Sequence, residues 1–289
     1  MLPRALLVAS VAALGIPALA CAPARDATRI AVAGGSLTEI VYLLGAQDRI
    51  VAVDTTSNYP EAATALPSVG YVRNLSVEGL LSLSPSLILG EDDMGPPAVL
   101  DQLAQAGVET VRVAEQHDPE GIFGKIACIG EVLGMGDEAD ARVEDLRAVA
   151  DRLAAYREVS ERSPRVAMLL NLRDGAPVAA GDNTSGGGFL RMAGARNVFP
   201  SIDGWKPVSP EAFAAANPDV IVIPERGVRA LGGVADVASH PSLRLTSAAR
   251  NGRIVVMDGM AMLGFGPRTL EAALDFATRL HGPVVGESE

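Results

Sequence analysis

The sequence predicts an α/β protein in which two related lobes, each built on a parallel sheet, are joined by one long helix. Three observations predict this fold class. Short apolar strands alternate with helical segments in both halves of the chain, a wholly helical stretch separates the halves, and both halves contain the same helix-and-strand pattern. The resulting division is a signal peptide at 1–20, an N-terminal lobe at 21–135, an interlobe helix at 136–162 and a C-terminal lobe at 163–289.

The first twenty residues have the features of a secretory signal peptide. Arg4 precedes an apolar run, and the segment ends in small residues at Ala18-Leu19-Ala20, so we expect the mature protein to be exported. Cys21 follows directly and has two possible fates. Ordinary cleavage leaves a soluble protein, which we favour, whereas lipidation of Cys21 makes a lipoprotein. If Cys21 is lipidated or lost, Cys128 is the only remaining thiol, and we expect no intramolecular disulfide.

Charge and hydropathy exclude two classes of partner. After removal of residues 1–20, 23 basic residues stand against 35 acidic ones, a formal charge of −12. This charge repels nucleic acid and anionic lipid surfaces. No later segment is long and apolar enough to span a bilayer. Membrane contact is therefore expected only through a lipid anchor or a membrane-bound partner.

The first lobe is predicted to begin with a strand, a helix and a second strand. We expect the strands at Ile30–Ala33 and Ile50–Val53 and the helix at about Leu37–Leu44. Ser36 and Glu39 have the spacing of a capping box at the start of that helix. Two more helix-and-strand pairs follow, in "SVEGLLSLSPSLILG" and "PPAVLDQLAQAGVETVRV", so the lobe should contain a parallel sheet.

The sequence predicts a long helix in the middle of the chain, at 136–162. Apolar residues recur there at helical spacing for more than about twenty residues, which is long for a helix inside a compact α/β unit. These residues are Val143, Leu146, Val149, Leu153 and Tyr156. The alternation resumes after Ser163-Pro164 with "RVAMLL", "SPEAFAAANPDVIVIP" and "RIVVMD", which predicts the second lobe.

The two lobes share a repeated unit. "LSVEGLLSLSPSLIL" and "VSPEAFAAANPDVIV" align at a constant offset of 133 residues. Each unit has a Ser cap, an early Glu, an apolar helix, a Pro stop and a buried strand. The matched pairs are Ser76 with Ser209, Glu78 with Glu211, Leu80 with Phe213, Pro85 with Pro218 and Ile88 with Ile221. Two related lobes are expected to enclose a cleft.

The loops at the carboxyl ends of the strands should line that cleft, because parallel sheets bind their ligands there. The candidate segments are "GGS", "DTTSNYP", "GYVRN", "GEDDMGPP", "GDNTSGGG", "DGWKP" and "PERGVRALGG". Asp92 and Asp93 in "GEDDMGPP" resemble a cation site, but we interpret them as a solvated loop.

No enzymatic signature is present in the sequence. It lacks a phosphate-binding P-loop, a nucleophile elbow, a zinc-protease motif and a pair of close cysteines. His117, His240 and His281 are scattered and form no ligand pair at helical spacing. We therefore expect a binding protein and not an enzyme.

Tyr71 and Arg73 in "GYVRN" are the strongest candidates for a ligand site. An exposed turn Tyr beside a surface Arg is the purely structural alternative. A phenolate, however, is a hard oxygen ligand for ferric haem. A Tyr ligand must lose its proton, and a nearby guanidinium favours the charged form. Arg226 or Arg229 in "PERGVRALGG" would reach the same site from the other lobe or pair with ligand carboxylates.

Several segments together resemble the periplasmic haem-binding proteins of bacterial haem ABC importers. They are "GGSLTEIVYLLGAQDRIVAVD", "YPEAATALPSVGYVRNLSVEGLLSLSPSLIL", "GPPAVLDQLAQAGVETV", "GWKPVSPEAFAAANPDVIV", "ERGVRALGGV" and "VVMDGMAMLGFGPRT". The resemblance covers nearly the whole mature chain. Cobalamin- and siderophore-binding proteins share the general pattern, whereas "GYVRNLS" and "LGFGPRT" carry the likeness to the haem proteins.

The resemblance implies the helical-backbone, class III periplasmic binding fold, with two Rossmann-like lobes joined by a rigid helix. It also implies that Tyr71 is the axial ligand of haem b iron, that Arg73 lies near the ligand, and that Arg226 or Arg229 supplies the second-lobe Arg. Some relatives add a His in the second lobe, but "LLNLRDG" in that region has none. The number of bound haems is therefore open.

The resemblance further implies that Glu78 and Glu211 dock onto basic residues of a membrane permease. The expected function is that of a monomeric extracytoplasmic hemin receptor that delivers haem to an ABC permease. Cobalamin or a ferric siderophore is the alternative ligand for the same fold. A secreted hydrolase and a structural envelope protein are the alternatives from other classes.

Overall fold

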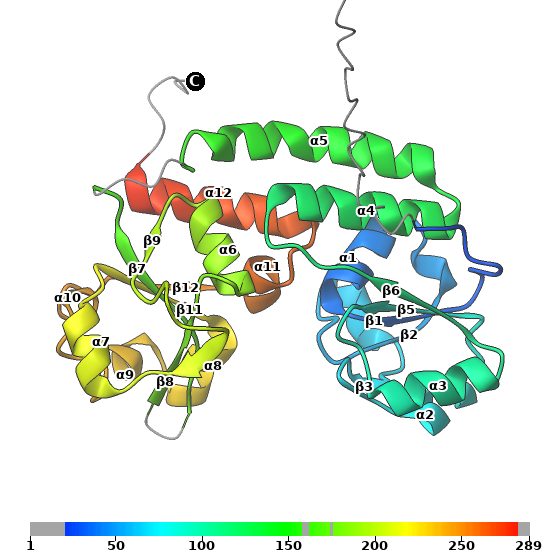
Figure 1. Ribbon diagram of the computed structural model, residues 1–289, viewed down its shortest axis with the longest axis horizontal. Helices are drawn as coiled ribbons and strands as arrows, with labels where there is room; N and C mark the ends of the chain where they lie inside the picture. Colours follow the sequence, from blue (N-terminus) through cyan, green and yellow to red (C-terminus); the bar gives the residue numbers. More distant parts are fainter. Residues whose placement is uncertain (1–20, 158–161, 174–175, 283–289) are drawn as a thin grey trace, which may run out of the picture.

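The computed structural model describes residues 21–157, 162–173 and 176–282 of the chain. Two α/β lobes lie side by side, and three long helices run along one side of the pair (Figure 1). The predicted α/β fold class is confirmed. The predicted signal peptide lies outside the described residues, and so does the stretch 158–161 at the predicted end of the interlobe helix.

The N-terminal lobe has a four-stranded, fully parallel sheet in the order β2-β1-β5-β6. Its central strands β1 and β5 are apolar and buried on both faces, as expected for a parallel sheet covered by helices. β1 and β2 occupy the residues predicted from the sequence. The elements are β1 Ile30–Ala33, α1 Gly35–Leu43, η1 Gln47–Arg49, β2 Ile50–Val53, η2 Glu61–Ala65, β3 Gly70–Tyr71, β4 Asn74–Leu75, α2 Val77–Ser82, β5 Leu87–Glu91, α3 Pro97–Gln105 and β6 Glu109–Val113.

The C-terminal lobe has a mixed sheet in the order β10-β8-β7-β11-β12, with β9 paired to β7. β7, β9, β11 and β12 are parallel to one another, whereas β8 and β10 are antiparallel additions that the sequence analysis did not predict. The elements are β7 Arg165–Arg173, β8 Ala176–Ala180, α6 Ser185–Met192, β9 Arg196–Asn197, β10 Trp205–Pro207, α7 Pro210–Ala216, β11 Val220–Pro224, α8 Glu225–Leu231, α9 Val234–Ser239, α10 Ser247–Arg250, β12 Ile254–Met257 and α11 Gly259–Leu263.

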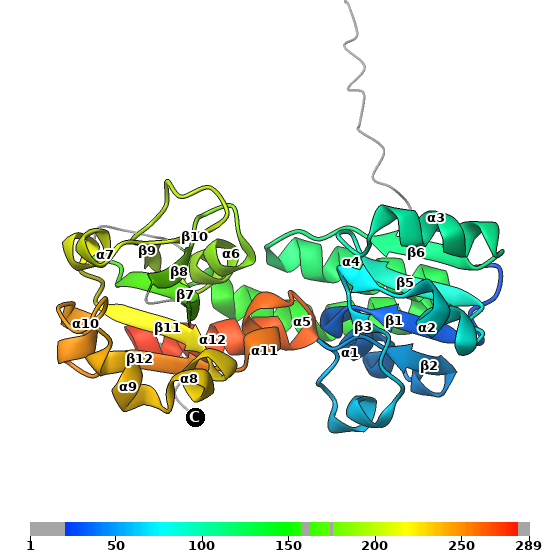
Figure 2. The ribbon, with the colours of Figure 1, turned by 90° about the horizontal axis from the view of Figure 1, so that it is seen from below.

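Three helices join the lobes: α4 Pro119–Leu133, α5 Gly136–Ala154 and α12 Pro267–His281. α5 packs on both α4 and α12 and extends across the two lobes (Figures 1 and 2). It has 19 residues and ends at Ala154. The interlobe helix was predicted to extend to residue 162, so the observed helix is shorter. Among the helices of the described residues, none combines the length and the apolarity needed to cross a membrane.

The repeated unit is present in three dimensions. Ser76 caps α2 by accepting from the Gly79 amide, and Ser209 caps α7 by accepting from the Ala212 amide, both at 3.2 Å. The apolar partners Leu80 and Phe213 are both buried. Each helix is followed by a residue with positive φ at the matched position, 48° at Ser84 and 40° at Asn217, and then by a buried strand. Both lobes therefore use the same local device.

The capping box predicted at Ser36 and Glu39 is wrong. α1 begins at Gly35, its N-cap is Gly34, and no side chain caps it. Gly34 has φ of 147°, and a Cβ at this position would lie 2.7 Å from the side chain of Glu91. Ser36 and Glu39 are buried and have partners elsewhere in the fold, because the helix start packs directly against the second lobe.

The sequence analysis excluded an intramolecular disulfide only for a chain whose Cys21 is lipidated or lost, and the structure has Cys21 in place and bonded. Cys21 and Cys128 are joined by a disulfide with their Cα atoms 5.1 Å apart, although 107 residues separate them in sequence. The backbone of Ala24 donates to the Val132 carbonyl at 3.0 Å, so the segment after Cys21 lies along α4. This packing brings the two sulfur atoms together.

Candidate functional site

Tyr71 and Arg73 lie on the small β3–β4 hairpin at the side of the N-terminal lobe that faces the C-terminal lobe (Figure 1). Tyr71 pairs with Asn74 across the hairpin, and Val72 and Arg73 form its turn. Val72 is buried, and its amide donates to Asp54 at 3.3 Å. Because Val72 anchors the turn, its neighbours Tyr71 and Arg73 stay exposed.

The Arg73 guanidinium links Tyr71 to Asp93. Its Nη1 donates to the Tyr71 hydroxyl oxygen, and its Nε donates to Asp93 Oδ2 at 2.6 Å. Nη2 also contacts Asp93 Oδ2. Burial by itself lowers the pKa of Arg73, but the hydrogen bonds and charges of Asp93 and Tyr71 outweigh it and raise the pKa. Arg73 therefore stays a cation beside the phenol oxygen.

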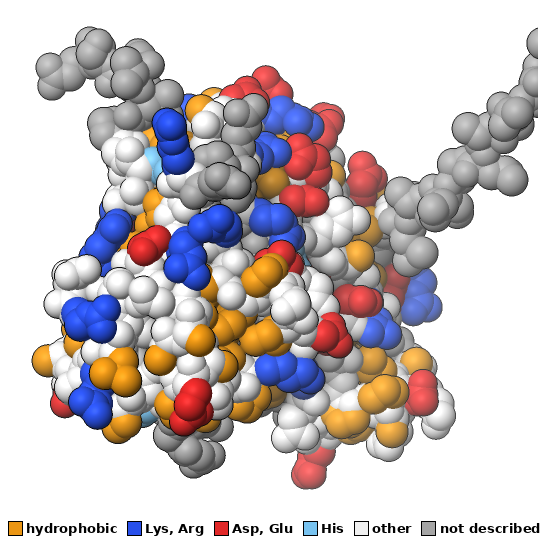
Figure 3. Space-filling model, turned by 60° about the vertical axis from the view of Figure 1, so that its left-hand side comes forward, with side chains coloured by type: hydrophobic (Ala, Val, Ile, Leu, Met, Phe, Trp, Pro, Cys, Tyr) orange, Lys and Arg blue, Asp and Glu red, His pale blue; other side chains and the backbone are white. Residues whose placement is uncertain are grey.

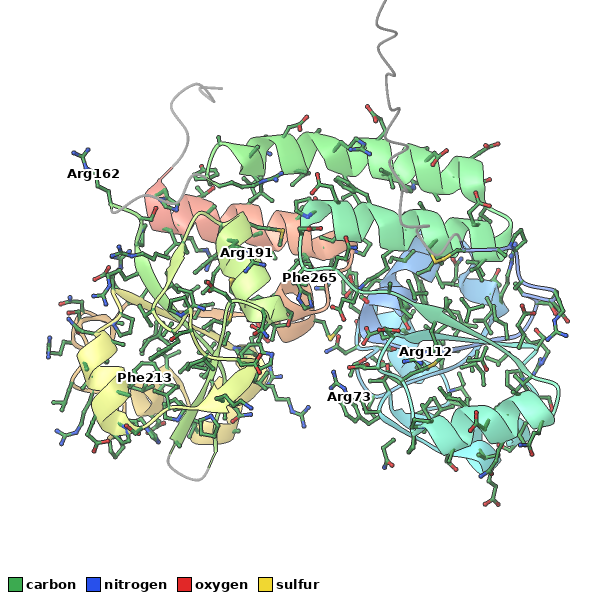
Figure 4. The ribbon with its side chains drawn as sticks, viewed as in Figure 1. Arg73, Arg112, Arg162, Arg191, Phe213 and Phe265 are labelled. Atoms are coloured by element: carbon green, nitrogen blue, oxygen red, sulfur yellow. A yellow bond between two sulfur atoms is a disulfide. The ribbon has the colours of Figure 1, made fainter. Side chains whose placement is uncertain are left out.

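Asp92 and Asp93 are exposed, as the sequence interpretation of a solvated loop implies, but both are paired. Asp93 binds Arg73, and Asp92 lies 3.6 Å from Arg112 on β6. Figure 4 shows Arg73 at the edge of the N-terminal lobe nearest the other lobe, with Arg112 farther from that lobe. In the part of the chain that the structure describes, no group of three or more His, Cys, Asp or Glu side chains is arranged to hold a metal ion.

The other three tyrosines differ from Tyr71 in their surroundings. Tyr42 packs against the core, and Tyr156 is buried and donates to the Gly282 carbonyl at 3.1 Å. Tyr59 is 46% exposed and Tyr71 is 41% exposed. The cation beside Tyr59 is Arg268, which lies over the face of its ring at 3.9 Å from the centroid. At Tyr71, in contrast, a guanidinium donates to the phenol oxygen itself.

Arg226 and Arg229 lie on α8 of the C-terminal lobe, across from the β3–β4 hairpin in two views (Figures 1 and 2). Arg229 pairs with Glu225 one turn earlier on the same helix, at 3.2 Å. Arg226 is exposed, and within the described residues no hydrogen bond or ion pair engages it. Leu170 on β7 is an exposed apolar residue. It lies beside α8, because a Cβ added at Gly227 of that helix would be 3.6 Å from the Leu170 carbonyl oxygen.

A buried polar cluster that the sequence analysis missed lies behind the hairpin. Ser36 donates to Glu91 at 3.2 Å, and the buried Lys125 donates to Ser36 at 3.2 Å and to the Gly264 carbonyl at 3.1 Å. Burial raises the pKa of Glu91 to about 7, Lys125 opposes this rise, and Glu115 adds to it. The position of Glu91 at the carboxyl end of β5 is a signal in the sequence, but nothing local marks Lys125.

Glu115 and His117 continue this cluster toward the second lobe. Burial raises the pKa of Glu115, but hydrogen bonding with His117 and the charges of Lys125 and Arg73 outweigh it, so the pKa is lowered. The His117 ring packs against Phe265 with centroids 5.0 Å apart. Figure 4 places Phe265 between the lobes, below the long helices. The cluster therefore reaches from the Arg73 side of the N-terminal lobe to the junction of the lobes.

Arg268, in the "LGFGPRT" segment, ties the lobes together at this junction. Its Nη2 donates to Glu39 of α1 at 2.6 Å and lies 3.7 Å from Asp258, the residue that caps α11. A Cβ at Gly266 would lie 3.2 Å from that of Ser36, so glycine allows the two segments to approach closely. This segment forms part of the contact between the lobes.

Glu78 and Glu211 lie far apart, on α2 and α7 at the outer parts of the two lobes (Figure 2). Both side chains are exposed in the first turn of their helices. Hydrogen bonds from its own backbone amide and from Ser209 lower the pKa of Glu211. The two acidic residues are therefore available to a partner that spans both lobes.

Charge is divided unequally between the lobes. Residues 21–135 contain six basic and fifteen acidic side chains, a formal charge of −9, whereas residues 163–289 contain twelve of each. Figure 3 shows Lys and Arg side chains spread over the visible face of the C-terminal lobe, with few acidic ones among them. The C-terminal lobe therefore carries twice as many basic side chains as the N-terminal lobe.

Comparison with known proteins identifies the family. The family model of the periplasmic binding protein matches residues 30–261. The solved periplasmic heme-binding protein BhuT, in complex with two hemes, is 39% identical with a TM-score of 0.81, covering 87% of this chain and 97% of BhuT.

Two further relatives have names that do not mention heme. The ABC transporter substrate-binding lipoprotein YvrC of Bacillus subtilis (strain 168) is 27% identical over 249 residues, 85% of this chain and 77% of YvrC. The vitamin B12-binding protein of Yersinia pseudotuberculosis serotype O:1b (strain IP 31758) is 29% identical over 223 residues, 77% of this chain and 76% of that protein.

The matched family is one of transport components and not of enzymes, in agreement with the missing catalytic motifs. The two lobes, the joining helices and the facing loops of this structure agree with that role. With the family model extending over most of its length, the chain belongs to the periplasmic binding protein family.

Proposed function

We propose that the protein is an extracytoplasmic receptor for ferric haem b, which Tyr71 ligates between the lobes and which the protein delivers to the permease of an ABC importer. One observation carries this proposal. The hydroxyl oxygen of an exposed Tyr, on the side of the N-terminal lobe that faces the other lobe, accepts a hydrogen bond from Arg73.

The chemistry of ferric iron explains why this pair matters. Phenolate oxygen is a hard donor that binds ferric haem, but a phenol has to lose its proton before it does so. A guanidinium at hydrogen-bond distance stabilises the negative oxygen. Tyr59 is exposed to a similar degree, but Arg268 contacts its ring face and not its oxygen. Tyr71 is therefore the better axial ligand.

The second lobe would bind the acidic edge of the porphyrin. Arg226 and Arg229 are the predicted clamps, and Arg226 is the better candidate because Glu225 already engages Arg229. A guanidinium binds a carboxylate through two parallel hydrogen bonds. Leu170, exposed beside the same helix, offers an apolar contact to the ring. The likeness to BhuT, whose structure contains two hemes, supports the same ligand class.

Glu78 and Glu211 are the proposed contacts to the permease. They occupy equivalent places in the repeated unit and lie on different lobes, so one partner with two basic sites would engage both. Charge reversal at both positions, Glu78→Lys with Glu211→Lys, should abolish hemin uptake by cells and leave hemin binding by the pure protein unchanged. Normal uptake by the double variant would contradict the docking role.

A hemin titration of the purified mature protein tests the ligand. The wild type should give the high-spin ferric spectrum of a Tyr-ligated haem, and Tyr71→Ala should abolish it. Tyr59→Phe is the matched control, since Tyr59 is the other exposed tyrosine, and it should keep the wild-type spectrum. If Tyr71→Ala keeps the spectrum and Tyr59→Phe loses it, the ligand assignment is wrong.

A corrinoid is the second candidate ligand, because a vitamin B12-binding protein is among the relatives of the chain. The sequence contains a single Trp, Trp205, and few aromatic residues for stacking on a corrin. Thermal shifts with hemin, cyanocobalamin and a ferric siderophore would separate the candidates, since tight binding raises the melting temperature by mass action. A large shift with cyanocobalamin and none with hemin would mean that the ligand is a corrinoid and not haem.

A further inference from the structure

We infer that Asp93 is a positioning residue of the ligand site, which fixes the Arg73 guanidinium so that its free edge faces the oxygen of Tyr71. This inference rests on the proposed function only where it predicts an effect of Asp93 on hemin affinity. The arrangement of the three side chains is a property of the ligand-free protein.

The contacts of Arg73 divide its guanidinium into two parts. Nε and Nη2 both engage Oδ2 of Asp93, and Nη1 donates to Tyr71. Since the guanidinium is planar, fixing one edge on a carboxylate also fixes the direction of the remaining nitrogen. Asp93 does not need to touch the ligand in order to set the direction in which Nη1 points.

The loop that carries Asp93 is attached firmly to the hairpin that carries Arg73. The Gly95 amide donates to the Val72 carbonyl at 3.0 Å, and the Leu75 amide donates to the Gly95 carbonyl at 2.8 Å. Met94, next to Asp93, is buried, and its sulfur lies where a Cβ on Gly90 would be. These contacts hold the carboxylate in place relative to the turn of the hairpin.

Without Asp93, Arg73 has another acidic neighbour. The charge of Arg73 acts on the partly buried Glu115, and the Arg73 side chain is itself about half exposed. An unrestrained Arg has several rotamers and loses conformational entropy when it is fixed. We therefore expect an Arg73 released from Asp93 to spend less time on the Tyr71 oxygen.

Two substitutions at Asp93 separate positioning from charge. Asp93→Ala removes the hydrogen-bond acceptor and should weaken hemin binding about tenfold. Asp93→Asn keeps an acceptor for Nε and should restore affinity to within about twofold of the wild type. The matched control is Asp92→Ala, at the adjacent exposed acidic residue that pairs with Arg112, and it should leave affinity unchanged. Equal affinity losses in Asp93→Ala and Asp93→Asn, or none in Asp93→Ala, would overturn the inference.

A double variant tests whether Asp93 acts through Arg73. Once Arg73→Ala has removed the guanidinium, adding Asp93→Ala should change hemin affinity by less than about twofold. A further tenfold loss in the double variant would mean that Asp93 contacts the ligand directly, and the positioning role would then be wrong.

A measurement without haem keeps this inference separate from the proposed function. The Nε–Hε resonance of Arg73 in the ligand-free protein, assigned with Arg73→Lys, should be protected from solvent exchange in the wild type and in Asp93→Asn. It should lose that protection in Asp93→Ala. If Nε–Hε is protected in the wild type but the protein does not bind hemin, Asp93 still anchors Arg73. The proposed function as a haem receptor would then be wrong. Equal exchange in wild type and Asp93→Ala would reject the anchor.

Discussion

Glu91 is the residue whose ionisation the fold changes in a way that can be measured directly. It ends β5, accepts from Ser36, and is surrounded by Lys125, Glu115 and Asp93. Its pKa of about 7 means that burial outweighs the attraction of Lys125. The protein therefore contains, next to the proposed ligand site, a carboxyl group that changes charge near neutral pH.

The stability of the fold should fall as Glu91 ionises. Between pH of about 4.5 and 7 the unfolded chain has lost this proton while the folded protein keeps it, so the free energy of unfolding decreases as pH rises, by up to about 3 kcal/mol. Glu91→Gln should remove this part of the decrease. Urea unfolding at about pH 5 and 8 measures it, with the exposed Glu78→Gln as control. An identical pH dependence in wild type and Glu91→Gln would contradict the raised pKa of this partly buried carboxyl.

At the scale of elements, the repeated helix-and-strand unit shows how local chemistry and burial combine. α2 and α7 are both short, so neither helix is stable by length alone. Each is stabilised by a Ser cap and by one large apolar side chain in the core, Leu80 or Phe213. The same unit also places Glu78 and Glu211 on the surface of the two lobes.

Loss of either cap should cost a similar amount of stability. Ser76→Ala and Ser209→Ala each remove an acceptor of one helical amide, and each should lower the free energy of unfolding by about 1 kcal/mol. The double variant should lose about 2 kcal/mol, because the two sites lie on different lobes. Ser82→Ala, an exposed serine at the end of α2, is the control in the same chemical denaturation experiment. A negligible cost at one cap only would show that the two units are not energetically equivalent.

At the scale of the whole molecule, the buried Lys125 and the partly buried Arg268 at the lobe junction limit how the lobes move. Arg268 pairs with Glu39, and Lys125 bonds to both Ser36 and the Gly264 carbonyl, so α1 of one lobe is tied to the "LGFGPRT" segment of the other. Burial raises the pKa of Glu39, and the hydrogen bond from Arg268 opposes it. Separating the lobes would break the Arg268–Glu39 ion pair and the hydrogen bond from Lys125 to Gly264, which is costly. We therefore expect small interlobe movements on ligand release.

The disulfide determines whether Cys21 is available for a lipid anchor. The sulfur of Cys21 cannot carry a lipid thioether while it is bonded to Cys128. We propose that the mature protein is exported to the periplasm without a lipid anchor, although the relative YvrC is named a lipoprotein. Intact-mass analysis of the exported protein should show no lipid, and thiol labelling should succeed only after reduction, at two sites. A diacylglyceryl mass on Cys21 with Cys128 free would contradict this.

Local sequence determined much of the fold, because strands, caps and helix ends depend on residues within a few positions of one another. The strands at Ile30–Ala33 and Ile50–Val53, and the caps at Ser76 and Ser209, follow from such patterns. Tyr71 and Arg73 could be proposed together for the same reason, since a single residue, Val72, separates them. The domain boundaries and the roles of the site residues stay predictions.

Only the tertiary structure decided which distant side chains meet. Asp93 is 20 residues from Arg73, Cys128 is 107 from Cys21, and Arg268 is 229 from Glu39. The same proximity explains why Ser36 and Glu39, which fit a local capping box, bind Glu91 and Arg268 instead. Strand order and the contact between the lobes set these partners. A buried polar group binds whatever partner the packing supplies, because leaving it unpaired costs more than giving up a local bond.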